Sequence, residues 1–213
     1  MVRDIDERLE QVMHAGGDRA QLDSVYDEWA RDYDQDLWAS GNPYFATLAA
    51  MTARYVDDTE ARILDCGCGT GLVGELLAIL GFTNLHGLDA SAGMMKAAAN
   101  KQCYAALHQL LLGPEIPLPA ESFDALVAGG VLTQGHAPPE SLEGMLALAK
   151  PDAPILFSMS NAGYEQYGFK DKIGALESAG RIEALTHSAS FRSYPYSQDH
   201  ADLKHWVSVY RKT

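Results

Sequence analysis

The chain has 213 residues, 47% of them hydrophobic and 21% charged, which is enough apolar material for the core of one α/β domain with a terminal extension. Its 29 acidic and 16 basic side chains give a formal net charge of −13, and such a field repels phosphate backbones and anionic lipid. No apolar run approaches the roughly 18 to 20 residues that a membrane helix needs. The charged N-terminus is unlike a signal peptide. We therefore expect a cytoplasmic protein with no nucleic-acid partner and no membrane partner.

The first 60 residues show helical patterns and no convincing strand. Polar residues at 23–24 precede a helix predicted over residues 25–37. Its aromatic side chains fall at steps of three and four and so share one face: Tyr26, Trp29, Tyr33. Asn42 followed by Pro43 predicts the start of a second helix over residues 44–55. We expect residues 1–60 to form a helical lid on a main domain of residues 61–213.

From residue 61 onward, strand patterns alternate with helix patterns. Strands are predicted at 61–65, 85–89, 104–110, 123–128 and 155–159, with helices at 72–80, 91–100, 138–149 and 170–179. This alternation predicts parallel strands joined by right-handed crossovers. Two last strand-like stretches, 181–191 and 204–211, have no helix pattern between them and predict an antiparallel pair at one edge. The fold class is therefore α/β, with a seven-stranded, mostly parallel sheet, helices on both faces and an antiparallel C-terminal edge strand.

A glycine-rich loop follows the first of these strands. Residues 63–71 read ILDCGCGTG, so that Asp65 precedes Gly67, Gly69 and Gly71. Glycine lets a backbone turn sharply and approach a ligand without a Cβ in the way. In an open α/β sheet such a loop lies at the carboxyl end of a strand, where ligands bind. The loop therefore predicts a cofactor site.

The glycines alone leave two cofactors open. Gly69 to Gly74 also fit the G-x-G-x-x-G pattern of a dinucleotide site, and Asp89 lies 20 residues after Gly69, as that pattern requires. Asp65 favours the other cofactor, because a carboxylate at the start of the loop would face the like charge of a pyrophosphate. S-adenosylmethionine has no phosphate and carries an ammonium and a sulfonium. A nicotinamide oxidoreductase remains the less favoured alternative.

The order strand, Asp65, then alternating glycines resembles motif I of the class I S-adenosylmethionine-dependent methyltransferases. Residues 25–37, 64–73 and 209–212 resemble, more narrowly, the methyltransferase-like proteins named for the Williams–Beuren syndrome chromosome region. This resemblance runs from about residue 24 to the end. It implies a Rossmann-like fold, S-adenosylmethionine as cofactor and S-adenosylhomocysteine as product. It does not imply a methyl acceptor.

The resemblance and the spacing together give a set of expected cofactor contacts. Asp89 ends the second strand, where a carboxylate accepts hydrogen bonds from ribose hydroxyls. Expected beside the adenine and ribose are Ala90, Met94, Leu111 and Leu112, and beside the methionine half Ala128 and Gly129. The expected loop contacts are Asp65, Gly67, Cys68, Gly69 and Thr70. Tyr26, Trp29 and Tyr33 are expected to close over the cofactor with a ring face toward the sulfonium, simple helix packing being the alternative.

The chemistry beyond the cofactor is less well defined by the sequence. His136, in the segment after the fourth strand, is the candidate general base for a protonated acceptor. Tyr164, Tyr167 and Phe169 are candidates for the wall of an acceptor pocket. The other histidines and the cysteines lack metal-ligand spacing, so no metal is expected. We expect a small-molecule acceptor and leave the oligomeric state open. The alternative is a cofactor-binding regulator without catalysis.

Overall fold

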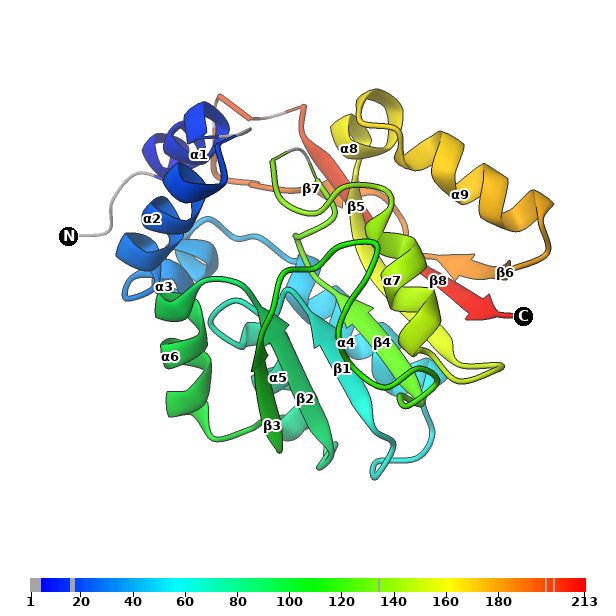
Figure 1. Cartoon of the computed structure of the whole chain (residues 1–213). Helices are drawn as coiled ribbons and strands as arrows, with labels where there is room; N and C mark the ends of the chain where they lie inside the picture. The colour runs from blue at the N-terminus through cyan, green and yellow to red at the C-terminus, as the bar shows by residue number, and fades with distance from the viewer. Residues whose placement is uncertain (1–4, 16–17, 134, 198, 201) are drawn as a thin grey trace.

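The computed structural model describes residues 5–15, 18–133, 135–197, 199–200 and 202–213 (Figure 1). Residues 1–4, part of the charged N-terminus from which the absence of a signal peptide was predicted, lie outside this set. Within the described residues, no helix combines the length and the apolar character needed to cross a membrane.

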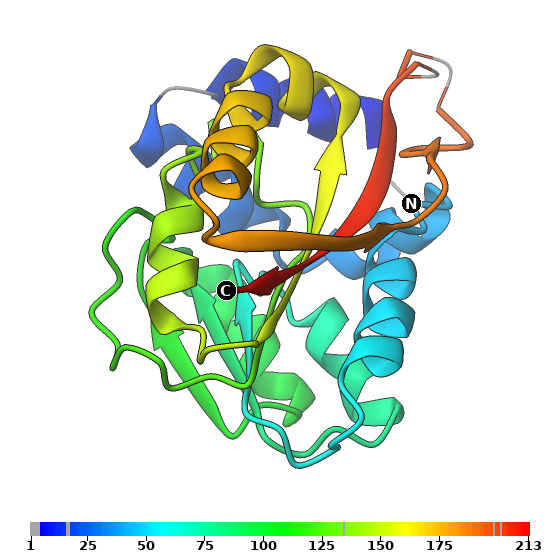
Figure 2. The same cartoon turned by 90° about the vertical axis from the view of Figure 1, so that its right-hand side faces the viewer.

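One twisted sheet in the order β3-β2-β1-β4-β5-β8-β6 forms the centre of the molecule. Its strands are β1 (Ile63–Cys66), β2 (Leu85–Asp89), β3 (Ala106–Gln109), β4 (Ala125–Ala128), β5 (Pro154–Ser160), β6 (Ile182–His187), β7 (Phe191–Arg192) and β8 (Lys204–Lys212). The first five strands are parallel to one another. The last three pair antiparallel (Figure 2). The predicted fold class, a mostly parallel Rossmann-like sheet with an antiparallel edge, is confirmed.

Two details of the sheet differ from the prediction. β8 lies between β5 and β6, so β6 is the edge strand, and the two-residue β7 adds an eighth strand that pairs with β8. The inner position of β8 agrees with its burial, since Val207 and Val209 are both fully buried. A strand covered on both sides is typically rich in such β-branched residues.

Helices cover both faces of the sheet. The helices are α1 (Ile5–Ala15), α2 (Arg19–Trp29), α3 (Tyr33–Ala39), α4 (Tyr44–Tyr55), α5 (Leu72–Ile79), α6 (Ala92–Lys101), α7 (Ser141–Leu148), α8 (Asn161–Gln166) and α9 (Phe169–Ser178). Side chains of α4 and α5 fill the core on one face, and side chains of α7 and α9 fill it on the other. Neighbouring residues of β1 alternate between these cores, with Ile63 in the first and Leu64 in the second.

The helix predicted over residues 25–37 is wrong in its bounds. The structure has two helices there, α2 and α3, separated by a turn at residues 30–32. Asp18 caps α2 by accepting hydrogen bonds from two backbone N–H groups, and Asp34 and Asp36 lie in the first turn of α3. Acidic side chains favour a helix start because they face the positive end of its dipole. The aromatic face survives the break, since Trp29 and Tyr33 pack edge to face at 4.7 Å.

The predicted helix over residues 44–55 is confirmed, as α4. Phe45 and Leu48 of this helix are fully buried against α5 and the sheet. This helix therefore belongs to the layer that covers the sheet. The helices α1 and α2, drawn in blue, lie over the carboxyl ends of the parallel strands (Figure 1). The division into a lid of residues 1–60 and a domain of residues 61–213 stays a prediction.

Candidate functional site

The glycine loop between β1 and α5 forms one wall of an open cavity. Gly67 and Gly69 have φ values of +74° and +53°, in the left-handed region that favours glycine. A Cβ on Gly67 would lie 2.6 Å from the Val131 side chain, too close for any real contact. A Cβ on Gly69 would meet nothing within 4 Å, because Gly69 faces the cavity. The backbone of the loop is thus open to a ligand.

Asp89, at the end of β2, lies on the same cavity and is held by backbone groups. Its two carboxylate oxygens accept hydrogen bonds from the N–H groups of Gly69 and Ser91, each at 2.9 Å. Burial raises the pKa of Asp89, and these two hydrogen bonds oppose the rise. Each carboxylate oxygen accepts about two hydrogen bonds, so both retain a lone pair for a ligand hydroxyl.

This first cavity gathers most of the residues predicted to bind the cofactor. The predicted residues that line it are Tyr26, Tyr33, Gly67, Gly69, Asp89, Ala90, Met94, Leu111, Leu112 and Gly129. Sequence reasoning missed part of the wall, which α2 contributes through Arg19, Leu22 and Asp23. These residues were missed because the helix was predicted to begin at residue 25, whereas α2 begins at Arg19 and is capped by Asp18. Arg19 is the one cationic side chain among the described lining residues, and it is paired with Asp23 at 2.8 Å.

The remaining predicted cofactor residues lie behind the wall rather than on it. Cys68 is buried, and its Sγ lies against Gly87 of β2. Ala128 is buried within the sheet. The Thr70 hydroxyl donates to Asp34 of α3. Trp29 lines a second cavity and donates its indole N–H to Asp36 at 2.8 Å. Direct contact of these residues with a cofactor stays a prediction.

Asp65 is also absent from the cavity lining, and its carboxylate lies beneath the loop. The hydroxyl of Tyr104, from the α6–β3 connection, donates to its Oδ2 at 2.7 Å. Its Oδ1 is buried and has no hydrogen-bond partner among the described residues. Burial raises the pKa of Asp65 to about 7, against the hydrogen bond from Tyr104. Sequence reasoning missed Tyr104, because nothing in its local pattern distinguishes it from a strand residue.

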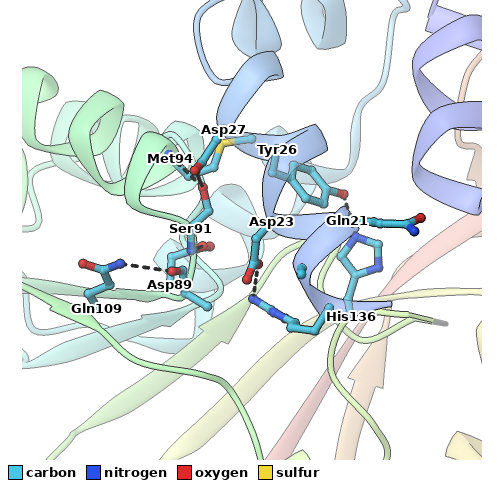
Figure 3. A network of polar contacts seen from close by, with 12 residues as sticks. Gln21, Asp23, Tyr26, Asp27, Asp89, Ser91, Met94, Gln109 and His136 are labelled. Atoms are coloured by element: carbon cyan, nitrogen blue, oxygen red, sulfur yellow. Dashed lines mark hydrogen bonds and ion pairs between the residues drawn. The ribbon is translucent and has the colours of Figure 1, made fainter. Parts of the chain in front are cut away.

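Two aspartates tie the N-terminal helices to the cofactor loops. Asp27 of α2 accepts hydrogen bonds from the Ser91 hydroxyl at 2.6 Å and from the Gly93 N–H at 2.8 Å (Figure 3). Asp34 of α3 pairs with Lys101 of α6 at 2.6 Å. Both anchors hold helices of the first 60 residues against the segments that follow β1 and β2. Sequence reasoning missed both contacts, because the partners of Asp27 and Asp34 lie far away in sequence.

A second cavity lies beside the first and shares four lining residues with it, Tyr26, Tyr33, Gly130 and His136. Its wall is rich in aromatic rings, contributed by Tyr26, Trp29, Tyr33, Tyr44, Tyr167 and Tyr194. Of the residues predicted to wall an acceptor pocket, Tyr167 lies here. Tyr164 instead packs edge to face on Trp206, and Phe169 is fully buried in the core. Those two predictions are not supported, because neither side chain lines the second cavity.

His136, the predicted general base, lies at the junction of the two cavities. Its Nε2 is 2.6 Å from the hydroxyl of Tyr26 (Figure 3). Burial raises the pKa of Tyr26 well above its usual value, so the phenol keeps its proton at neutral pH, and the tautomer of His136 sets which of the two groups donates. Tyr26 and His136 thus form a hydrogen-bonded pair of titratable groups where the two cavities meet. Elsewhere in the described residues, no group of three His, Cys, Asp or Glu side chains is arranged to hold a metal ion.

Comparisons with known proteins agree with this geometry. A family model described as a methyltransferase domain matches residues 64–157. Methyltransferase-like protein 27 of Homo sapiens is 36% identical over 189 residues, which are 82% of this chain and 74% of that protein. A ubiquinone biosynthesis O-methyltransferase of Histophilus somni is 26% identical over 157 residues, 70% of this chain and 63% of that protein.

Among solved structures, a TehB-like S-adenosylmethionine-dependent methyltransferase from Corynebacterium glutamicum superposes with a TM-score of 0.61 at 19% identity. The match covers 89% of this chain and 100% of that one. At this identity the likeness concerns the fold.

The first cavity fits S-adenosylmethionine better than a dinucleotide. Asp89 offers acceptor positions for ribose hydroxyls, and Met94, Leu111 and Leu112 offer an apolar surface for a base. The lone cation of the described lining, Arg19, already has Asp23 as its partner. A pyrophosphate would therefore meet the half-buried carboxylate of Asp89 without a compensating free charge among the described lining residues, which is costly.

Proposed function

We propose that this chain, which belongs to the class I S-adenosylmethionine-dependent methyltransferases, methylates a small molecule. The enzyme class and the cofactor follow from the family. The observation that supports a small acceptor is the second cavity, which adjoins the cofactor cavity and is covered by the N-terminal helices. A pocket lined by rings and a few polar groups is typical of small-molecule sites. The name of the Histophilus somni relative, an O-methyltransferase of ubiquinone biosynthesis, is compatible with this proposal.

Bound S-adenosylmethionine supplies a methyl group that its sulfonium has already activated. The chain's main task is then to hold the acceptor in line and to exclude water, which can contribute several kcal/mol, up to roughly 7–11 kcal/mol in well-oriented systems. Tyr26, Tyr33 and Gly130 border both cavities and so support this junction as the proposed place of transfer. Gly130 fits here because a Cβ would lie 2.7 Å from the hydroxyl of Tyr44.

His136 is proposed as the final proton acceptor for a hydroxyl or amine substrate. The acceptor's proton passes to the oxygen of Tyr26 while the Tyr26 proton passes to Nε2 of His136, along the existing 2.6 Å contact. Tyr26→Phe breaks this relay and leaves the ring in place. We expect the variant to lose about 10²-fold or more in kcat for an acceptor that must lose a proton, with unchanged affinity for S-adenosylhomocysteine.

The experiment for the acceptor class uses methyl-labelled S-adenosylmethionine and a cell extract separated by size into metabolites and macromolecules. The proposal expects label in the metabolite fraction with the native chain and its loss with Tyr26→Phe. Asp124→Asn, far from both cavities, is the matched control and keeps the activity. Label in protein or nucleic acid overturns the small-molecule proposal. No label in either fraction, with the cofactor bound, favours the regulator alternative. The cytoplasmic location and the absence of nucleic-acid and membrane partners stay predictions.

A further inference from the structure

The second cavity has no formally charged side chain among its described lining residues. It is lined by rings, aliphatic side chains, two hydroxyl side chains and three histidines. Two carboxylates beside lining residues are already engaged: Asp36 accepts from Trp29 at 2.8 Å, and Asp6 accepts from Ser197 at 2.5 Å. The guanidinium of Arg8 lies over the Trp29 ring, 5.9 Å from its centroid, and is not part of the lining. An ammonium or carboxylate ligand would therefore be desolvated without a partner of opposite charge in the lining, which is unfavourable.

His200, at the rim of this cavity, does not change that conclusion. Its Nε2 lies 4.0 Å from Oδ1 of Asp6, so a carboxylate already lies beside it. An anionic ligand at His200 would meet that carboxylate as a like charge. The wall as a whole favours a neutral ligand, and the six aromatic side chains around it favour one with a planar ring.

His205 adds one specific polar feature. It is the second residue of β8 and lines the second cavity but not the first. The hydroxyl of Ser193 donates its single hydrogen to the carbonyl of Leu203 at 2.9 Å. With that hydrogen on Leu203, the contact of 2.5 Å between the hydroxyl oxygen and Nδ1 of His205 is a hydrogen bond only if Nδ1 donates. The arrangement that satisfies both contacts at once is therefore the tautomer in which Nε2 keeps its lone pair.

The environment keeps this imidazole neutral. Burial lowers the pKa of His205 to about 4, and the ring stacks on Tyr44 with centroids 5.9 Å apart. No hydrogen bond joins Nε2 to any described residue, and Nε2 is not among the fully buried atoms that lack a partner, so it is open to the cavity. His205 thus presents an unpaired hydrogen-bond acceptor to the cavity.

We propose that the second cavity takes an uncharged aromatic acceptor whose O–H or N–H group donates a hydrogen bond to Nε2 of His205. This donor is separate from the atom that is methylated, because transfer occurs at the junction of the cavities and His205 lies outside the junction. His205 is in this account a specificity-determining residue. The inference rests on the proposed function, since it identifies the class of the small molecule.

The test measures binding to the full chain saturated with S-adenosylhomocysteine. The probes are four naphthalenes that carry, at one ring position, a hydroxyl, a methoxy, a carboxylate or an aminomethyl group. The hydroxyl compound is expected to bind about three- to tenfold more tightly than the methoxy compound, the effect of one neutral hydrogen bond. His205→Phe, which keeps a ring on Tyr44, is expected to bring that ratio close to one. His187→Phe, on β6 and outside this cavity, is the matched control and keeps the native ratio.

Three results overturn the inference. Binding of the carboxylate or the aminomethyl probe as tight as that of naphthol contradicts a neutral ligand. Equal binding of the hydroxyl and methoxy probes to the native chain contradicts the role of His205, whether or not His205→Phe folds. The absence of binding by every naphthalene, with S-adenosylhomocysteine bound, contradicts the aromatic class. If the extract assay still labels metabolites, the small-molecule function stands and only this inference fails.

Discussion

The buried carboxyl of Asp65 should make the unfolding free energy of this protein depend on pH. Burial raises its pKa to about 7 from the ordinary value of 3.8. The folded state therefore binds this proton more tightly than the unfolded chain, so the carboxyl stabilises the fold most below pH 4. That contribution falls as the pH rises toward 7 and is constant above it. A difference of about three pKa units at 1.36 kcal/mol per unit amounts to about 4 kcal/mol.

Asp65→Asn removes the titrating group and keeps an acceptor for the Tyr104 hydroxyl. We expect the gap in unfolding free energy between Asp65→Asn and the native chain to widen by about 1.4 kcal/mol per pH unit from pH 5 to 7 and then to level off. Urea unfolding followed by tryptophan fluorescence measures it, since Trp29 is buried.

The control for this series is Asp124→Asn. The Lys150 ammonium and the Arg62 N–H lower the pKa of Asp124 in spite of its partial desolvation. Its stabilising effect is present above its unfolded pKa and is lost only at lower pH, so its gap should be flat from pH 5 to 8. A gap for Asp65→Asn that is equally flat would refute a folded pKa near 7.

Two further predictions concern the packing around the cofactor loops. Gly74→Ala places a Cβ 2.3 Å from the Tyr104 ring, and we expect it to lower the unfolding free energy by about 1–3 kcal/mol. Adding Tyr104→Ala should make the double variant more stable than the sum of the two single losses predicts, and strict additivity in urea unfolding would contradict the clash. Asp27→Ala removes the acceptor of two hydrogen bonds and should cost about 1–3 kcal/mol; an unfolding free energy within about 0.5 kcal/mol of the native value would show that this anchor is unimportant.

The arrangement of the sheet could be predicted from the sequence because each strand and helix has a local signal. β2 was predicted with the bounds that the structure shows, and Ser91 caps α6 as its position suggested, by accepting from the Met94 N–H. The helix break at residues 30–32 could not be predicted in the same way. A hydrogen bond from Trp29 to Asp36 spans the break, and the continuous 3.6-residue period of the segment gives no sign of this contact.

The candidate site shows the same division. Asp89 and the glycines were found because their position after a strand determines where they lie. Asp65 was expected to face the ligand, but alternation along β1 directs its side chain to the face that holds Tyr104. Tyr104 and His205 have no motif around them. Their roles arise from contacts with residues far away in sequence, and only the folded chain brings these together.

The most direct measurement of the central claim is a calorimetric titration with S-adenosylhomocysteine, S-adenosylmethionine and NADH. The account predicts saturable binding of both sulfur compounds and none of NADH. Asp89→Ala should weaken S-adenosylhomocysteine binding at least about tenfold, since it removes charge-assisted hydrogen bonds, while Asp124→Ala leaves that affinity unchanged. Tight NADH binding without either sulfur compound, or native affinity in a folded Asp89→Ala variant, would contradict the account.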